Sequence, residues 1–178
     1  DRIETGTYAM AVAMTGGDVL LQNTRPELLQ SALDVLKQTG ASVTATNEGI
    51  RVTRNGAGLM PVDVITAPFP GFPTDLQAQL MALMSLAHGT SHITETIFEN
   101  RFMHVQELAR LGAHIHLDGE TATIAGVARL PGAPVMATEW RARLSRVVAR
   151  FAARGGAMVT RHPHLTPGVG RRGRRPPP

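Results

Sequence analysis

Hydrophobic and polar positions follow two periods along the chain, one typical of helices and one typical of strands. Apolar residues recur at spacings of three and four in PELLQSALDVLKQT (26–39) and MHVQELARL (103–111), which predicts two amphipathic helices. Each is followed by a glycine, Gly40 or Gly112, as expected at a helix C-terminus. After each glycine, apolar and polar residues alternate around a turn, in ASVTATNEGIRVTRN and AHIHLDGETATIAG, which predicts two β-hairpins.

The order of these patterns repeats. Gly17 corresponds to Gly89 and Gly40 to Gly112, both at a spacing of 72 residues. Such self-similarity predicts a fold built from repeated units, which we place at about residues 1–60, 61–130 and 131–161. The first unit lacks an opening strand. The third begins with TEWRARLSRV, an echo of TDLQAQLMAL, but no amphipathic helix or hairpin follows it.

One helix of each unit is expected to be buried. The segment LMALMSLAH is apolar almost throughout, which is typical of a helix surrounded by protein. Three such helices inside three small sheets would form an inside-out α/β barrel. The predicted class is therefore an α/β domain of βαβαββ-type units over residues 1–161, with the third unit incomplete.

Charge is distributed unevenly. Residues 1–139 carry 8 basic and 14 acidic side chains, for a net −6, whereas residues 140–178 carry 10 arginines and no acid. We expect the Arg/Pro-rich segment 162–178 to be a disordered tail. A basic tail can bind phosphates, but no aromatic residue follows Phe151 to stack on bases, which argues against a nucleic-acid partner.

The composition also bears on the cellular compartment in which the protein is expected. The chain has no cysteine, so it forms no disulfide or thiolate metal site, as is usual in reducing compartments. It has no apolar run long enough to suggest a membrane span. The first residues, DRIETGTYAM, have no basic region typical of a signal peptide. We expect a cytoplasmic protein without a membrane partner. Because there is no initiator methionine, we also expect a fragment.

The segment FPTDLQAQL (72–80) raises a question of chemistry. Thr74 followed by Gln77 matches a capping box, with Thr74 as N-cap and Asp75 in the first turn of a helix. Alternatively, a carboxylate held at a helix start beside a proline is well placed for acid–base catalysis. Spacing alone favours capping, which is the commoner reason for this pattern.

Several longer motifs are specific to one enzyme family. DRIETGT (1–7), TAPFPGFPTDLQAQ (66–79), TETIFENRFMHV (94–105), LGAHI and GAPVMAT (132–138) together resemble the UDP-N-acetylglucosamine 1-carboxyvinyltransferases, the enolpyruvyl transferases of bacterial peptidoglycan synthesis. The resemblance implies two domains of three repeats each, with the active site between them, and this chain resembles most of one domain. We do not associate the related 5-enolpyruvylshikimate-3-phosphate synthases, which share the fold, with FENRFMH or PTDxQAQ.

The resemblance implies site residues. Asp75 matches the base that faces the sugar hydroxyl, and Ile97 matches a position whose main chain contacts the UDP-sugar. Arg101 and Arg141 match arginines near the substrates, so all four are candidate substrate-binding residues. The implied partners are UDP-N-acetylglucosamine and phosphoenolpyruvate, with no cofactor and no metal. The other domain would supply a loop cysteine, so we expect this chain to be inactive alone.

The resemblance weakens after Arg141. Family members have a helix of small residues there, whereas this chain has arginines at 143, 146 and 150. Pro167 stands where the family has a further arginine. The alternatives are therefore a non-catalytic nucleotide-sugar-binding module, a basic-tailed adaptor, or a 5-enolpyruvylshikimate-3-phosphate synthase-like transferase. His114 and His116 share one face of a predicted strand, but no third ligand accompanies them to make a metal site.

Overall fold

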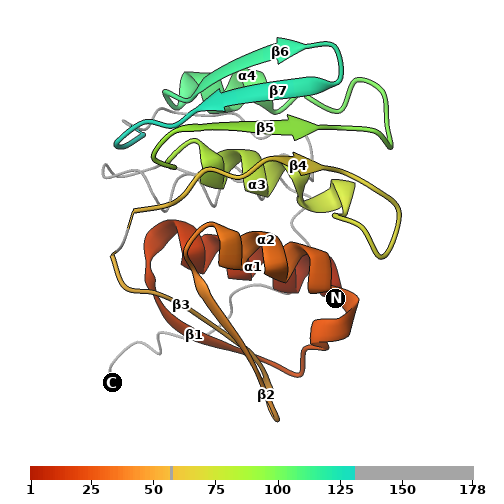
Figure 1. Ribbon diagram of the computed structural model, residues 1–178, viewed down its shortest axis with the longest axis vertical. Helices are drawn as coiled ribbons and strands as arrows, with labels where there is room; N and C mark the ends of the chain where they lie inside the picture. Colours follow the sequence, from red (N-terminus) through yellow and green to blue (C-terminus); the bar gives the residue numbers. More distant parts are fainter. Residues whose placement is uncertain (57, 131–178) are drawn as a thin grey trace, which may run out of the picture.

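Two units with the same order of α-helices and hairpin strands follow each other in the computed structural model, which describes residues 1–56 and 58–130 (Figure 1). The first unit consists of α1 (Arg2–Thr15), β1 (Gly17–Gln22), the 3-10 helix η1 (Pro26–Leu28), α2 (Gln30–Gln38), β2 (Ser42–Thr46) and β3 (Gly49–Arg54). The second consists of β4 (Val64–Ile65), the 3-10 helix η2 (Thr74–Leu76), α3 (Gln77–Met84), β5 (Thr90–Thr94), α4 (Val105–Arg110), β6 (His114–Asp118) and β7 (Thr121–Ala125).

Each unit has its own sheet, with the same arrangement. The first sheet has the order β1-β3-β2 and the second β4-β5-β7-β6. All neighbours are antiparallel except β4, which runs parallel to β5. In the first sheet β3 lies between β1 and β2, and in the second β7 lies between β5 and β6, so Ile50 of β3 pairs with Leu21, and Ala122 of β7 pairs with Ile93. The three strands of the first sheet thus correspond to β5, β7 and β6, and β4 has no counterpart among the described strands of the first sheet.

Equivalent glycines end the outer helix of each unit. Gly40 follows α2 with φ 93°, and Gly112 follows α4 with φ 98°. Residues with a Cβ rarely adopt this left-handed conformation, which explains glycine at both positions. The amide of Gly40 donates to the carbonyl of Lys37, and that of Gly112 donates to the carbonyl of Ala109. The sequence signal for these two helix ends is therefore confirmed.

Helices α1 and α3 lie at the centre of the core. Residues 80–84 of α3 are completely buried, and so are Ala9, Met10 and Ala13 of α1. The two helices contact each other, and each packs on the sheet of its own unit. The buried helix predicted from LMALMSLAH is confirmed, although it ends at Met84 rather than continuing to residue 88.

The two central helices touch through equivalent residues. Thr7 of α1 and Gln79 of α3 are 72 residues apart, and Gln79 Nε2 donates to Thr7 Oγ1 over 3.0 Å. The Thr7 hydroxyl donates its own proton to the carbonyl of Ile3, at 2.8 Å. It can therefore only accept from Gln79. Helices α1 and α3, which occupy equivalent places in the two units, are thus in direct contact.

The predicted amphipathic helices are shorter than their patterns suggested. Residues 26–39 form η1 and then α2, separated by Leu29, whose φ of −131° is not helical. In 103–111, only Val105–Arg110 is α-helix. The third unit expected at 131–161 and the tail at 162–178 lie outside the residues that the structure describes.

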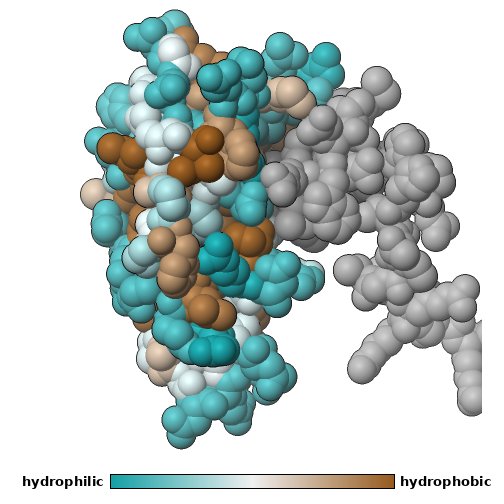
Figure 2. All heavy atoms as spheres, turned by 90° about the vertical axis from the view of Figure 1, so that its right-hand side faces the viewer, coloured by the Kyte–Doolittle hydropathy of each residue, from teal (hydrophilic) through white to brown (hydrophobic). Residues whose placement is uncertain are grey.

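Within the described ranges, no helix is long and apolar enough to cross a membrane. On the face seen in Figure 2, hydrophobic residues form separate patches among hydrophilic ones. The large hydrophobic side chains that are most exposed include Ile65, Phe69, Phe98 and Met103. Phe98 and Met103 line the pocket described next.

Candidate functional site

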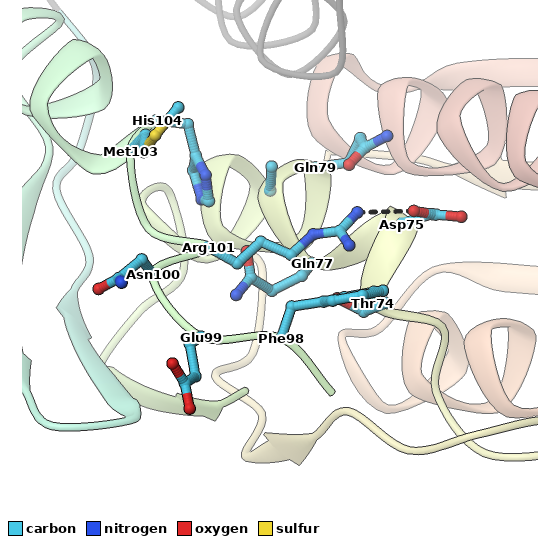
Figure 3. A pocket seen from close by; sticks show the side chains of 11 residues that line it. Thr74, Asp75, Gln77, Gln79, Phe98, Glu99, Asn100, Arg101, Met103 and His104 are labelled. Carbon is cyan, nitrogen blue, oxygen red and sulfur yellow. Dashed lines mark hydrogen bonds and ion pairs between the residues drawn. The ribbon is translucent and has the colours of Figure 1, made fainter. Parts of the chain in front are cut away.

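A pocket of about 240 Å³ lies where the start of α3 meets the loop that follows β5. One wall comes from η2 and the first turn of α3, and the other from the loop between β5 and α4 (Figure 3). Its lining residues are Thr74, Asp75, Gln77, Ala78, Gln79, Phe98, Glu99, Asn100, Arg101, Met103 and His104. Two sequence motifs, PTDLQAQ and FENRFMH, therefore form opposite walls of one pocket.

An ion pair joins the two walls. Arg101 extends from its loop to Asp75, and its Nη2 donates to Asp75 Oδ1 over 2.6 Å (Figure 3). The Asp75 side chain is 37% exposed and that of Arg101 is 17% exposed, so the pair is only partly in contact with solvent. The guanidinium also lies over the ring of Phe98, 4.9 Å from its centroid. This stacking further limits where Arg101 can lie. Two of the four candidate residues, Asp75 and Arg101, are therefore in direct contact.

The predicted capping box is wrong. Asp75 lies in the 3-10 turn η2, and neither η2 nor α3 has a side-chain N-cap hydrogen bond. The Thr74 hydroxyl instead donates to Glu95 Oε2 at 2.7 Å, and Gln77 Nε2 donates to the same oxygen at 3.2 Å. A buried carboxylate from a neighbouring strand end therefore holds the residues on both sides of Asp75.

Sequence reasoning did not identify Glu95. Only 2% of its surface is exposed, and it follows β5 directly. The strand period contained the signal, because Ser91, Ile93 and Glu95 are all buried and alternate with the less buried His92 and Thr94. An acidic residue at a buried position of an alternating pattern indicates a hydrogen-bonded carboxylate.

Ile97 lies beside the pocket and does not line it. It is in the loop after β5 and is partly buried, and its amide donates to Glu95 Oε1 at 2.9 Å. The next residue, Phe98, does line the pocket. The structure therefore does not bring Ile97 together with Asp75 and Arg101. Arg141, the fourth candidate, lies outside the described residues.

The pocket can support two kinds of interaction. Its charged side chains are the carboxylates of Asp75 and Glu99 and the guanidinium of Arg101. A partly exposed carboxylate can accept a proton from a hydroxyl group. A guanidinium presents several donors to a carboxylate or a phosphate. The arrangement thus suits proton transfer next to an anionic ligand.

Metal binding has no support in the part of the chain that the structure describes. No three His, Asp or Glu side chains gather there as they would around an ion. His114 and His116 do lie on one face of β6, as their spacing predicted, and both are exposed.

A model of the EPSP synthase (3-phosphoshikimate 1-carboxyvinyltransferase) family matches residues 1–169. The chain is 75% identical over 171 residues to UDP-N-acetylglucosamine 1-carboxyvinyltransferase of Rhodopseudomonas palustris strain BisB18, and 74% identical over 168 residues to that of Nitrobacter winogradskyi. These matches cover 96% and 94% of this chain, but only 40% and 39% of the relatives. The resemblance seen in the motifs is confirmed, and the chain spans about 40% of the length of these relatives.

Two solved structures have a similar fold. The enolpyruvyl transferase NikO from Streptomyces tendae superposes with a TM-score of 0.77 at 26% identity, over 93% of this chain and 39% of NikO. EPSP synthase from Acinetobacter baumannii superposes with a TM-score of 0.63 at 17% identity, over 87% of this chain and 38% of that structure. The chain therefore has an enolpyruvyl transferase fold of mixed α and β structure.

Proposed function

The chain belongs to the EPSP synthase (3-phosphoshikimate 1-carboxyvinyltransferase) family, and from this we propose that it forms part of a UDP-N-acetylglucosamine 1-carboxyvinyltransferase. The reaction moves the carboxyvinyl group of phosphoenolpyruvate to the 3′-hydroxyl of UDP-N-acetylglucosamine, a step of peptidoglycan synthesis. The observation that supports it most strongly is the 75% identity to the relative from Rhodopseudomonas palustris over 171 residues.

Asp75 is the proposed base. The sugar hydroxyl is a poor nucleophile until its proton is removed, and a positioned carboxylate can remove it. As Asp75 takes the proton, the hydroxyl oxygen forms a bond to C2 of phosphoenolpyruvate, and C3 gains a proton from an acid that the other domain is proposed to supply. Loss of phosphate from C2 and of a proton from C3 then restores the double bond. The ion pair with Arg101 fixes the carboxylate in the pocket wall for the first step.

The remaining groups are proposed to come from elsewhere in the intact enzyme. The chain has no cysteine, and the family resemblance assigns a loop cysteine that acts on phosphoenolpyruvate to the other domain. We therefore propose that this chain alone does not turn over substrates. Ile97 would contact the UDP-sugar through its main chain, and Arg141 would face phosphoenolpyruvate.

We also propose that the two observed units belong to a larger inside-out barrel. The inner helices α1 and α3 each pack on their own sheet and contact each other, as two members of a three-unit arrangement would. Residues 131–161 would supply the third, incomplete unit of a domain spanning 1–161.

A chimaera provides a direct test. In this chimaera, residues 1–130 of this chain replace the matching segment of the Rhodopseudomonas palustris relative, which supplies all remaining parts. We expect it to release phosphate from UDP-N-acetylglucosamine and phosphoenolpyruvate. Asp75→Asn should lower kcat by about 10²–10⁴-fold, because it removes the base. Asp118→Asn, the same change on an exposed strand end, should leave kcat unchanged.

Two outcomes would count against the proposal. An inactive chimaera that folds would show that these residues do not serve this reaction. Normal turnover by Asp75→Asn would remove Asp75 from its role. The isolated chain should release no phosphate, and binding of UDP-N-acetylglucosamine to it, measured by calorimetry, would separate a binding module from a protein without affinity for the sugar nucleotide.

A further inference from the structure

The buried carboxylate of Glu95 connects the two walls of the pocket. It is 2% exposed and accepts five hydrogen bonds, three from side chains and two from backbone amides. The donors to Oε2 are Thr74 Oγ1 at 2.7 Å and Gln77 Nε2 at 3.2 Å, and the donors to Oε1 are Thr66 Oγ1 at 2.9 Å, the Ile97 amide at 2.9 Å and the Phe98 amide at 3.3 Å.

All five donors are neutral. Among residues 1–56 and 58–130, no Arg, Lys or His forms an ion pair with Glu95. A buried carboxylate is unfavourable unless hydrogen bonds replace the water that it has lost. Hydrogen bonds to an ionised acceptor are also stronger than neutral ones. The negative charge thus makes each of the five contacts more costly to break.

The donors lie on the segments that carry the candidate site residues. Thr74 and Gln77 are on either side of Asp75 in the chain. The amides of Ile97 and Phe98 begin the loop that leads to Arg101. One carboxylate therefore sets the distance between the two segments whose side chains form the 2.6 Å ion pair.

We propose that Glu95 is a positioning residue for the carboxyvinyl transfer, acting through Asp75 on one wall and through the Ile97 loop on the other. Its side chain is not among those that line the pocket, so it does not touch the substrate itself. This inference rests on the proposed function, and its test has one arm that does not depend on that function.

Glu95→Gln has a specific expected effect on the contacts. The amides of Ile97 and Phe98 can only donate, so the new amide oxygen must face them, and its NH2 group must face Thr74 and Gln77. The Thr74 hydroxyl can rotate to accept a hydrogen bond from the new NH2 group. The NH2 group of Gln77 would face that same NH2 group, so the Gln77 amide has to rotate and present its oxygen instead. The substitution therefore loosens the Asp75 wall first.

The first arm measures kinetics in the chimaera defined above. Glu95→Gln should lower kcat by about 100-fold, the order expected when a reacting group is displaced by about 1 Å, and should raise KM for the UDP-sugar. Thr74→Val, which removes one link to Glu95, should lower kcat, whereas Thr74→Ser keeps the hydroxyl and should restore it. Thr39→Val, which removes a buried hydroxyl far along the chain, should change neither kcat nor KM.

The second arm measures amide hydrogen exchange in the full 178-residue chain. Glu95→Gln should speed exchange at Ile97 and Phe98 by at least about tenfold relative to Thr39→Val, because local opening sets this rate.

Wild-type kcat and KM for Glu95→Gln in an active chimaera would overturn the inference. If the wild-type chimaera is inactive, the proposed function fails, and unchanged exchange at Ile97 and Phe98 would then overturn the inference separately. If Glu95→Gln does not fold, equal kcat for Thr74→Val and Thr74→Ser would overturn it.

Discussion

At the scale of single residues, Gly126 shows how closely two segments approach. A Cβ added to Gly126 would lie 1.7 Å from the carbonyl oxygen of Ala87. The amide of Gly126 donates to the Gly89 carbonyl at 2.9 Å, and the Val127 amide donates to the Ser85 carbonyl at 2.8 Å. The end of β7 is therefore fixed against the turn that follows α3, with no space for a side chain between them.

Gly126→Ala should destabilise the protein by about 1–3 kcal/mol, the cost expected when extra atoms force a packed region apart. Urea unfolding of the full chain measures the change in the free energy of unfolding. Gly119→Asn is the matched control, because Gly119 has open space around its Cβ position and a φ of 55°, which Asn tolerates. A Gly126→Ala protein as stable as this control would contradict the close approach.

The residues around Asp75 show what local sequence can and cannot predict. The two motifs that carry Asp75 and Arg101 meet in one pocket, whereas the roles of these residues at a substrate site stay a prediction. The capping box was wrong because its pattern considers only neighbours in sequence. Thr74 and Gln77 find their partner in Glu95, 21 and 18 residues away, and no local rule contains that contact.

At the scale of elements, the short strand β4 is tied to β5 by a side chain. Asp63, just before β4, accepts from the backbone amide of His92 at 2.7 Å and contacts His92 Nδ1 at 3.0 Å. The backbone hydrogen bond is the main reason that the pKa of Asp63 lies below its ordinary value, and the side chain of His92 adds to it. The ionised form of Asp63 therefore favours the folded state.

Asp63→Asn should change how stability depends on acid. Because the folded state lowers the pKa of Asp63, its contribution is fully present above the ordinary pKa and is lost as pH falls through the folded-state value. The free energies of unfolding of wild type and variant should thus differ most near neutral pH, and the difference should shrink as the pH falls below the ordinary value of 3.8. Urea unfolding across this range is the measurement. Asp118→Asn, at an exposed carboxylate at the end of β6, provides the control. A constant difference between wild type and Asp63→Asn would contradict the expectation.

The repeat of elements was largely predictable because its signals are local. Glycines at a fixed spacing, helical periods and alternating hairpins each act within a few residues. The lengths of α2 and α4 were not predictable in the same way, since Leu29 leaves the helical conformation although its sequence pattern continues. The two-residue strand β4 has no period of its own and exists through its parallel pairing with β5.

At the scale of the whole molecule, the two units share one core. Buried hydrophobic residues of both units form a single cluster, from Ala9 in α1 to Ile124 in β7. Among the described residues the two sheets do not pair with each other. The units contact each other through packing around α1 and α3, through a bridge between Leu59 and Ala87, and through a hydrogen bond from the Ser31 hydroxyl to the Gly71 carbonyl. A defect in one unit should therefore weaken the other.

Leu36→Ala tests this coupling. Leu36 is fully buried in α2, so its truncation should cost about 2–5 kcal/mol. If the units unfold together, native-state hydrogen exchange should show the same loss of protection in β3 of the first unit and in β7 of the second. A loss confined to β3 would show that the units open independently.

The hydrogen bond between Thr7 and Gln79 has a consequence for how such a protein can change over time. Thr7 and Gln79 occupy equivalent positions in the two copies of the repeat, and each of them contacts the other. A replacement accepted at one of these sites alters the selective pressure on its counterpart 72 residues away. The two sites should accordingly covary among relatives, so that the halves of this region cannot diverge as freely as two domains joined by a linker.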